Sequence, residues 1–115
     1  SELSGGMRKR VAIARAIVLK PKYLFCDEPN SGLDPKTSIV IDQLIKEITI
    51  EFDTTTIINT HDMNSVMEIG DKIAFIYNGE LFWHGNNRDI FESDNIKLND
   101  FVFASKIYKK FRAMK

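Results

Sequence analysis

Apolar and polar positions follow a helical period and then a strand-like run in the first third of the chain. Between residues 5 and 19, apolar side chains recur at helical spacing with cations on the opposite side, which predicts a helix ended by Pro21. The apolar members of this stripe are Met7, Val11, Ala14 and Val18. The unbroken apolar run at 23–26 is typical of a strand buried on both faces of a parallel sheet.

A second helix and a second strand follow in the same order. Asp34 and Pro35 form an N-cap and first-turn pair, which predicts a helix over about 35–51. Its apolar stripe consists of Ile41, Leu44, Ile45 and Ile48. The β-branched stretch 54–59 predicts another buried strand, and a short helix after it ends at Gly70. This alternation of helices and strands favours an α/β fold with a parallel sheet.

The last 45 residues have a different pattern. Two strand-like segments, 72–77 and 80–84, flank Asn78-Gly79, the dipeptide that suits the positive φ angles of a two-residue hairpin turn. Two helical stretches follow, at about 87–92 and 96–112. We therefore expect a β-hairpin and a helical tail after the parallel strands.

Composition narrows the class of protein. The 115 residues include 16 basic and 16 acidic side chains, 43% hydrophobic and 28% charged residues, which is typical of a globular domain or part of one and excludes a disordered chain. No apolar run approaches the ~18 residues of a membrane span, and no signal-peptide pattern begins the chain. The lone Cys26 cannot form an internal disulfide. A net charge of zero argues against a surface built for nucleic acid.

An acidic pair, Asp27-Glu28, directly follows the first predicted strand. Parallel α/β sheets gather their ligands at the carboxyl ends of their strands, so this pair is where chemistry is expected. Asp27 could hold Mg²⁺, and Glu28 could position and deprotonate a water for attack on a terminal phosphate. The alternative is a structural role, as a helix cap or in an ion pair.

Three further motifs have both a functional and a structural interpretation. Ser4-Gly5-Gly6 at a helix start offers backbone N–H groups and a hydroxyl to a phosphate, although such a turn is also a common loop. The segment 31–34, Ser-Gly-Leu-Asp, could be an ordinary turn that caps the next helix. His61, just past the second strand, could be a hydrogen-bonded structural histidine.

The order of these motifs resembles the C-terminal half of an ABC-type ATPase domain, a P-loop NTPase of RecA-like fold. The signature motif, the Walker B strand with its glutamate, the D-loop and the H-loop histidine all match between residues 1 and about 62. The hairpin up to Gly85 is similar to the family's usual continuation. The resemblance implies an ATPase-domain part at 1–92 and a C-terminal helical tail at 93–115.

The resemblance also implies a role for each motif in binding ATP and Mg²⁺. Asp27 would help to hold Mg²⁺ through water, Glu28 would be the general base, and His61 would hydrogen-bond the γ-phosphate. Two subunits would close head to tail around ATP, so that some residues act on nucleotide held by the opposite subunit or across the interface. These residues are Ser4, Gly5, Gly6 and Asp34.

The main departure from the family pattern is the P-loop. None of the six glycines begins or ends a Gly-x-x-x-x-Gly-Lys-Ser/Thr motif, so we expect the chain to be part of a longer protein and to be inactive alone. Asn30 stands where threonine is common, and Met7 stands where transporters usually have glutamine.

Met7 and the region near Asp100-Phe101-Val102 are similar to the ATPase subunit of Mla-type phospholipid transporters. That likeness implies an integral membrane permease, an MCE-domain lipid-binding protein and a cytoplasmic location at the inner face of the membrane, with no nucleic acid. Two alternatives remain. One is the C-terminal head of an SMC-type chromosome-maintenance or DNA-repair ATPase, although no heptad run is present here. The other is a non-catalytic interaction segment.

Overall fold

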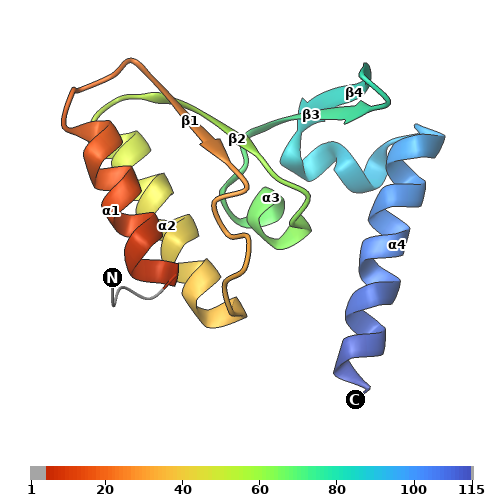
Figure 1. Cartoon of the computed structure of the whole chain (residues 1–115). Helices are drawn as coiled ribbons and strands as arrows, with labels where there is room; N and C mark the ends of the chain where they lie inside the picture. The colour runs from red at the N-terminus through yellow and green to blue at the C-terminus, as the bar shows by residue number, and fades with distance from the viewer. Residues whose placement is uncertain (1–4, 115) are drawn as a thin grey trace. The chain divides into compact units, whose positions relative to one another are not determined.

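The computed structural model describes residues 5–114, except for the side chains of 107–109 and 111–113. Its elements are α1 (Gly5–Ile17), β1 (Tyr23–Asp27), α2 (Pro35–Glu51), β2 (Thr55–Asn59), α3 (Met63–Ile69), β3 (Lys72–Tyr77), β4 (Glu80–Asn86), the 3-10 helix η1 (Asn87–Glu92) and α4 (Ile96–Ala113) (Figure 1). This order confirms the predicted α/β arrangement of parallel strands and helices followed by a hairpin and a helical tail. Each predicted element lies within two or three residues of its observed bounds.

The chain forms two compact units, which divide between Ser65 and Val66 inside α3. The predicted boundary between an ATPase part at 1–92 and a tail at 93–115 concerns family relationship rather than compactness, and it stays a prediction.

The first unit is built on two parallel strands, β1 and β2, joined through α2. Leu24 pairs with Thr56 in register, and these two side chains face the helices. The Thr49 hydroxyl of α2 lies 2.6 Å from the Thr56 hydroxyl, which holds α2 against this face. Ile41, Ile45 and Ile48 of the predicted α2 stripe are buried. The core of this unit therefore lies between α2 and one face of the strands.

The outer face of β1 is exposed, so the prediction of burial on both faces is wrong for the described residues. Tyr23 is 61% exposed and Phe25 is 72% exposed, while Leu24 between them is buried. A strand's side chains alternate between faces, and the helices here cover only one of them. An apolar run reveals a strand, whereas its burial depends on whether a second layer of structure is present.

The buried side of α1 also differs from the predicted stripe. Met7, Val11 and Val18 are substantially exposed, and Gly6 and Ile13 are the buried residues of the helix. The reason is steric: a Cβ atom added to Gly6 would lie 2.6 Å from the Thr37 side chain, so the glycine side is the one that can approach α2. α1 and α2 accordingly lie side by side (Figure 1).

The second unit consists of the end of α3, the β3–β4 hairpin, η1 and α4. The strands are antiparallel with a bulge between Phe75 and Ile76, and Asn78 and Gly79 have the positive φ angles predicted for the turn. Ile90, Leu98 and Val102 are buried among the side chains described in this unit, and the rings of Phe75 and Phe101 lie 5.5 Å apart. The tail helix thus contributes to the core of this unit.

Candidate active site

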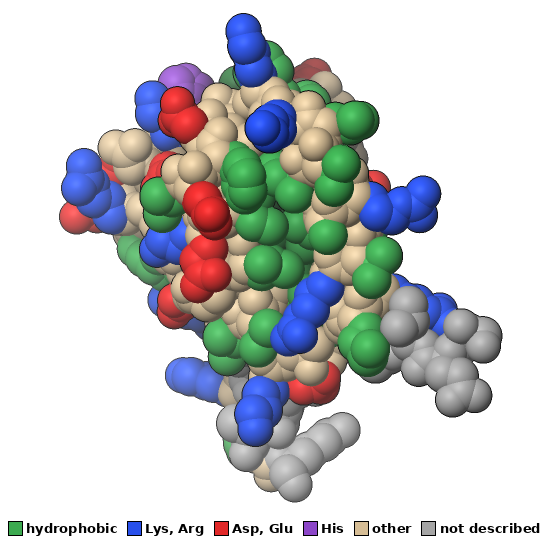
Figure 2. All heavy atoms as spheres, turned by 90° about the vertical axis from the view of Figure 1, so that its left-hand side faces the viewer, with side chains coloured by type: hydrophobic (Ala, Val, Ile, Leu, Met, Phe, Trp, Pro, Cys, Tyr) green, Lys and Arg blue, Asp and Glu red, His purple; other side chains and the backbone are tan. Residues whose placement is uncertain are grey.

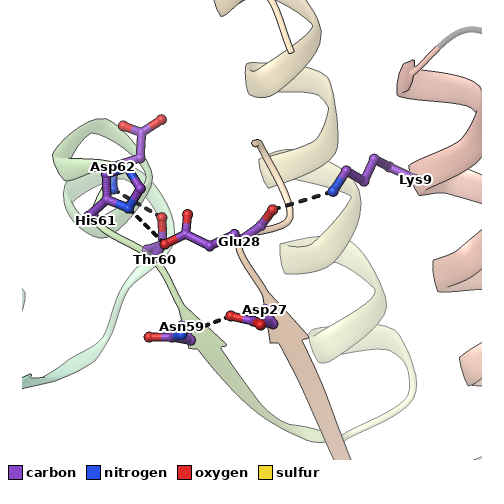
Figure 3. Close-up of polar contacts among 7 residues, drawn as sticks. All are labelled: Lys9, Asp27, Glu28, Asn59, Thr60, His61 and Asp62. Carbon is purple, nitrogen blue, oxygen red and sulfur yellow. Dashed lines mark hydrogen bonds and ion pairs between the residues drawn. The ribbon is translucent and has the colours of Figure 1, made fainter. Parts of the chain in front are cut away.

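The carboxyl ends of β1 and β2 lie at the same edge because the strands are parallel and in register. Asp27 is paired with Asn59, the last residue of the neighbouring strand. The Asn59 side-chain amide donates a 2.8 Å hydrogen bond to one Asp27 oxygen, Oδ1 (Figure 3). Both residues belong to the exposed face of the sheet, because they alternate with Leu24, Cys26 and their partners. The Asp27 carboxylate is therefore oriented by a neutral donor and stays accessible.

Glu28 leaves the strand in an unusual backbone conformation. Its φ angle is +46°, a left-handed value that costs energy for a residue with a side chain. Its backbone N–H donates a 2.7 Å hydrogen bond to the Asn59 carbonyl, which continues the ladder of the two strands by one bond. The chain thus turns sharply at Glu28 while its backbone remains attached to β2.

Glu28 and His61 form the closest contact between ionisable side chains at this edge. His61 Nδ1 lies 2.7 Å from Glu28 Oε1, and Figure 3 shows the ring and the carboxylate directed toward each other. The imidazole is 80% exposed and the carboxylate 32% exposed. A base and a hydrogen-bonding imidazole therefore meet where a ligand can reach both.

The loop that carries His61 is held by its own side chains. The Thr60 hydroxyl accepts a hydrogen bond from the Asp62 N–H at 3.0 Å, and Asp62 Oδ1 accepts one from the Asn64 N–H at 2.9 Å. Such side-chain-to-backbone bonds stabilise tight turns and helix starts. They fix the chain between β2 and α3, and with it the position of the imidazole.

The start of α1 lies close to the start of α2. A Cβ atom on Gly5 would lie 3.0 Å from the Leu33 side chain, and the space beside Gly6 is tighter still. Further along α1, Lys9 Nζ donates a long, 3.4 Å hydrogen bond to the Glu28 backbone carbonyl. α1 is thereby connected both to the loop that precedes α2, through Leu33, and to the backbone of Glu28.

Asp34 is the N-cap of α2. Its Oδ2 accepts a 3.1 Å hydrogen bond from the Thr37 N–H, and its Oδ1 accepts one from the Thr37 hydroxyl. These two bonds, the hydroxyl bond above all, lower the pKa of the Asp34 carboxyl, which is fully exposed. The cap interpretation of Asp34 is thus confirmed, and the carboxylate stays ionised.

The residues present are compatible with Mg²⁺ without forming a closed metal site. No group of three His, Cys, Asp or Glu side chains suited to a metal occurs in residues 5–114 where side chains are described. Mg²⁺ usually keeps several waters and binds through one or two carboxylates plus substrate phosphates. Asp27 fits that role, because Asn59 engages Oδ1 and the residue is exposed.

The structure brings most of the predicted site residues into two groups. Asp27, Glu28 and His61 meet at the strand ends, whereas Gly5, Gly6 and Asp34 gather where α1 and α2 begin. Ser4 lies outside the described residues. Sequence reasoning overlooked Asn59 and Lys9, whose contacts follow from strand register and from the packing of α1.

The chain is similar in sequence and fold to several known proteins. The family model described as ABC transporter matches residues 1–31. The methionine import ATP-binding protein MetN 1 of Oceanobacillus iheyensis is 46% identical over 103 residues, which are 89% of this chain and 30% of that protein. The chain thus spans about 30% of the length of this curated relative. None of the helices described here is long and apolar enough to cross a membrane.

Two solved structures share the fold at 38% identity. One is cbiO1 from Clostridium perfringens, part of the ABC transporter complex cbiONQ, with a TM-score of 0.74 over 83% of this chain and 38% of that one. The other is the dimeric ATP-binding cassette MJ0796 bound to ADP and Pi, with a TM-score of 0.65 over 76% of this chain and 37% of that one. By sequence and by fold, this stretch of chain is similar to the ATP-binding domains of ABC transporters.

Proposed function

We propose that this chain carries the catalytic carboxylate of an ABC transporter subunit that binds and hydrolyses ATP. The observation that supports this most directly is the 2.7 Å contact between Glu28 and His61 at the ends of neighbouring parallel strands. A carboxylate there can accept the proton of an attacking water, and the imidazole can donate a hydrogen bond to the terminal phosphate. Bound Mg²⁺ would neutralise phosphate charge, with Asp27 holding it through water.

The second group of residues is proposed to act between two copies of the subunit. Ser4, Gly5 and Gly6 would meet nucleotide held by the opposite subunit, and Asp34 would lie across the interface in a head-to-tail homodimer. The exposure of Asp34 supports this, as does the dimeric state of the solved relative bound to ADP and Pi. Hydrolysis would then depend on closure of the dimer.

An integral membrane permease is the proposed partner of the ATPase dimer, which would be cytoplasmic and peripheral on the inner face of the membrane. The solved relative cbiO1 is itself part of an ABC transporter complex, cbiONQ. Phospholipid is the proposed cargo, with an MCE-domain protein as a further partner. Met7 supports this, because its exposed position argues against a simple core role for the unusual residue after the signature glycines. Methionine is the competing cargo, because one of the relatives is named for methionine import.

A Glu28→Gln variant of the native protein tests the proposed chemistry. Glutamine keeps the shape of the side chain and removes the base, so ATP turnover should be abolished while ATP binding is retained and the closed dimer accumulates. Turnover by phosphate release and binding by calorimetry provide the two measurements. Glu47→Gln, an exposed glutamate on α2, is the matched control and should hydrolyse ATP normally.

Turnover near the wild-type rate in Glu28→Gln would show that Glu28 is not the base. An SMC-type ATPase would also lose turnover, so association with DNA rather than with a permease is the outcome that would favour that alternative.

The 115 residues alone contain no P-loop, and we expect them to bind Mg-ATP too weakly for micromolar titration and not to hydrolyse it. The non-catalytic alternative would be supported if the native protein neither bound nor hydrolysed ATP.

A further inference from the structure

Three buried polar side chains form a closed hydrogen-bonded triangle in the first unit. Asn30, Asp42 and Ser65 are 8%, 5% and 2% exposed. The Asn30 amide donates to Asp42 Oδ1 and to Ser65 Oγ, each at 2.7 Å, and the Ser65 hydroxyl donates to Asp42 Oδ2 at 2.9 Å. We call these residues the buried triangle.

The buried triangle joins the three segments that carry the candidate site. Asn30 lies two residues after Glu28, and Ser65 lies four residues after His61, in the first turn of α3. Asp42 lies on α2, the helix capped by Asp34. If the loop that carries Glu28 moved relative to the loop that carries His61, at least one of these hydrogen bonds would therefore break.

Stability alone does not explain the buried triangle. The Asn30 oxygen Oδ1 is buried with no hydrogen-bond partner among the described residues, a costly arrangement for a polar atom. Rotating the amide would not help, because it would turn that oxygen toward a carboxylate that can only accept. Apolar side chains of similar size often match or exceed the stability of a buried polar group. A hydrogen-bonded triangle, however, permits only one alignment of its three segments.

We propose that Asn30 is a positioning residue that, through Asp42 and Ser65, sets the spacing between Glu28 and His61. This inference rests on the proposed function, because it takes that pair to be catalytic. Asn30 itself would not touch nucleotide. It fixes the geometry of the two residues that do.

Kinetics of the native protein test this role through Asn30→Leu, which has similar volume and no donors. The expected result is a roughly 10- to 100-fold lower kcat per folded molecule, the penalty of a small misplacement of reacting groups. The KM for ATP should change less than about threefold, because the pair contributes little to ground-state binding. Thr54→Val is the matched control, since Thr54 is equally buried in the same unit but lies at the other end of β2. An unchanged kcat in Asn30→Leu, or an equal loss in Thr54→Val, would overturn the proposal.

Exchanging the side chains of Asn30 and Asp42 distinguishes a positioning role from a general loss of stability. Asn30→Asp places two carboxylates in the buried triangle, and Asp42→Asn places two amides there, so each alone should lower kcat. The double variant again has one carboxylate and one amide, and it should recover most of the lost rate. Failure of the double variant to exceed both single variants would count against the buried triangle.

A spectroscopic measurement separates this inference from the proposed function. The imidazole ring signals of His61 should shift in Asn30→Leu and return toward wild type in the exchanged double variant, whereas those of His84 in β4 should not move. Unmoved His61 signals would overturn the inference even if Glu28→Gln confirms the hydrolysis. Absent hydrolysis with shifted His61 signals would instead overturn the proposed function and leave the positioning role in place.

Discussion

The side chains at the ends of β1 and β2 each offer a different chemical group. Glu28 can accept a proton, His61 can donate a hydrogen bond, and Asp27 can hold a hydrated cation while Asn59 orients it. The exposure of the imidazole leaves it accessible to a ligand, which would take the hydrogen bond that His61 makes with Glu28 in this structure. These differences allow each residue to be tested by its own substitution.

His61→Ala should slow ATP hydrolysis by the native protein by roughly two to three orders of magnitude, the effect expected for loss of a donor to the transition state. ATP binding should change much less. Phosphate release under single-turnover conditions measures the effect, and His84→Ala, an exposed histidine of the second unit, is the control. Unchanged turnover in His61→Ala would mean that the histidine is structural.

The positions of Asp27, Glu28 and His61 relative to the strands could be predicted, but their contacts could not. Asp27 and Glu28 directly follow the apolar run 23–26, and His61 lies two residues beyond the end of β2, so their place near a strand end is a local property of the sequence. The contribution of Asn59 depends on the register of β1 against β2, and a one-residue shift would turn its amide to the other face. The contact of Lys9 with the Glu28 carbonyl depends on which side of α1 faces the sheet.

Among the elements, α2 has the clearest link between local sequence and stability. Asp34 caps its first turn and Pro35 begins it, while the buried isoleucines hold it against the strands. The bounds of α2 and of the hairpin were predictable because caps and Asn-Gly turns act over a few residues. The buried side of α1 was not, because it depends on the space left by Leu33 and Thr37.

The Asp34 cap predicts a pH dependence of stability. Hydrogen bonds from Thr37 lower the pKa of Asp34 in the folded state, so the unfolded chain binds more protons at acidic pH. This contribution is fully present above the ordinary carboxyl pKa and is lost as pH falls through the lower, folded-state pKa. Asp34→Ala should therefore destabilise the native protein at neutral pH, and the difference should shrink in acid.

Urea unfolding at both pH values measures this difference. Asp34→Asn keeps a capping oxygen without the charge. Its loss of unfolding free energy at neutral pH should therefore be smaller than that of Asp34→Ala. Added salt should weaken any charge-dependent part, because the carboxylate is fully exposed. If the stability lost in Asp34→Ala increased as pH falls, the pKa of Asp34 could not be lowered by folding.

At the scale of the first unit, large apolar side chains are exposed on two surfaces. Figure 2 shows hydrophobic side chains exposed between charged ones on the side where α1 lies in Figure 1. Met7 and Val11 of α1 are exposed, as is Val18 directly after it. Tyr23, Phe25 and Ile57 are exposed on the outer face of the two-stranded sheet. The sequence revealed these residues as apolar, but it could not show that they lack a covering layer in this part of the chain.

We expect the 115-residue polypeptide to self-associate in isolation, because its short sheet combines an apolar outer face with open edges. Light scattering at tens of micromolar, a concentration range where exposed edges aggregate, should detect it. Phe25→Thr should reduce the association, whereas Ile76→Thr, at an exposed position in the hairpin, should do so less. A stable monomer with sharp cooperative unfolding would contradict this expectation.

The left-handed backbone of Glu28 sets selection for stable folding against selection for ATP turnover. Glycine, and to a lesser degree asparagine, adopts a φ angle of +46° more easily than glutamate does. Selection for folding alone would therefore favour replacing this residue, whereas selection for turnover would retain it as the base that we propose. Among descendants of this sequence that no longer need hydrolysis, position 28 is accordingly where drift should first remove a charged side chain and leave a more stable protein behind.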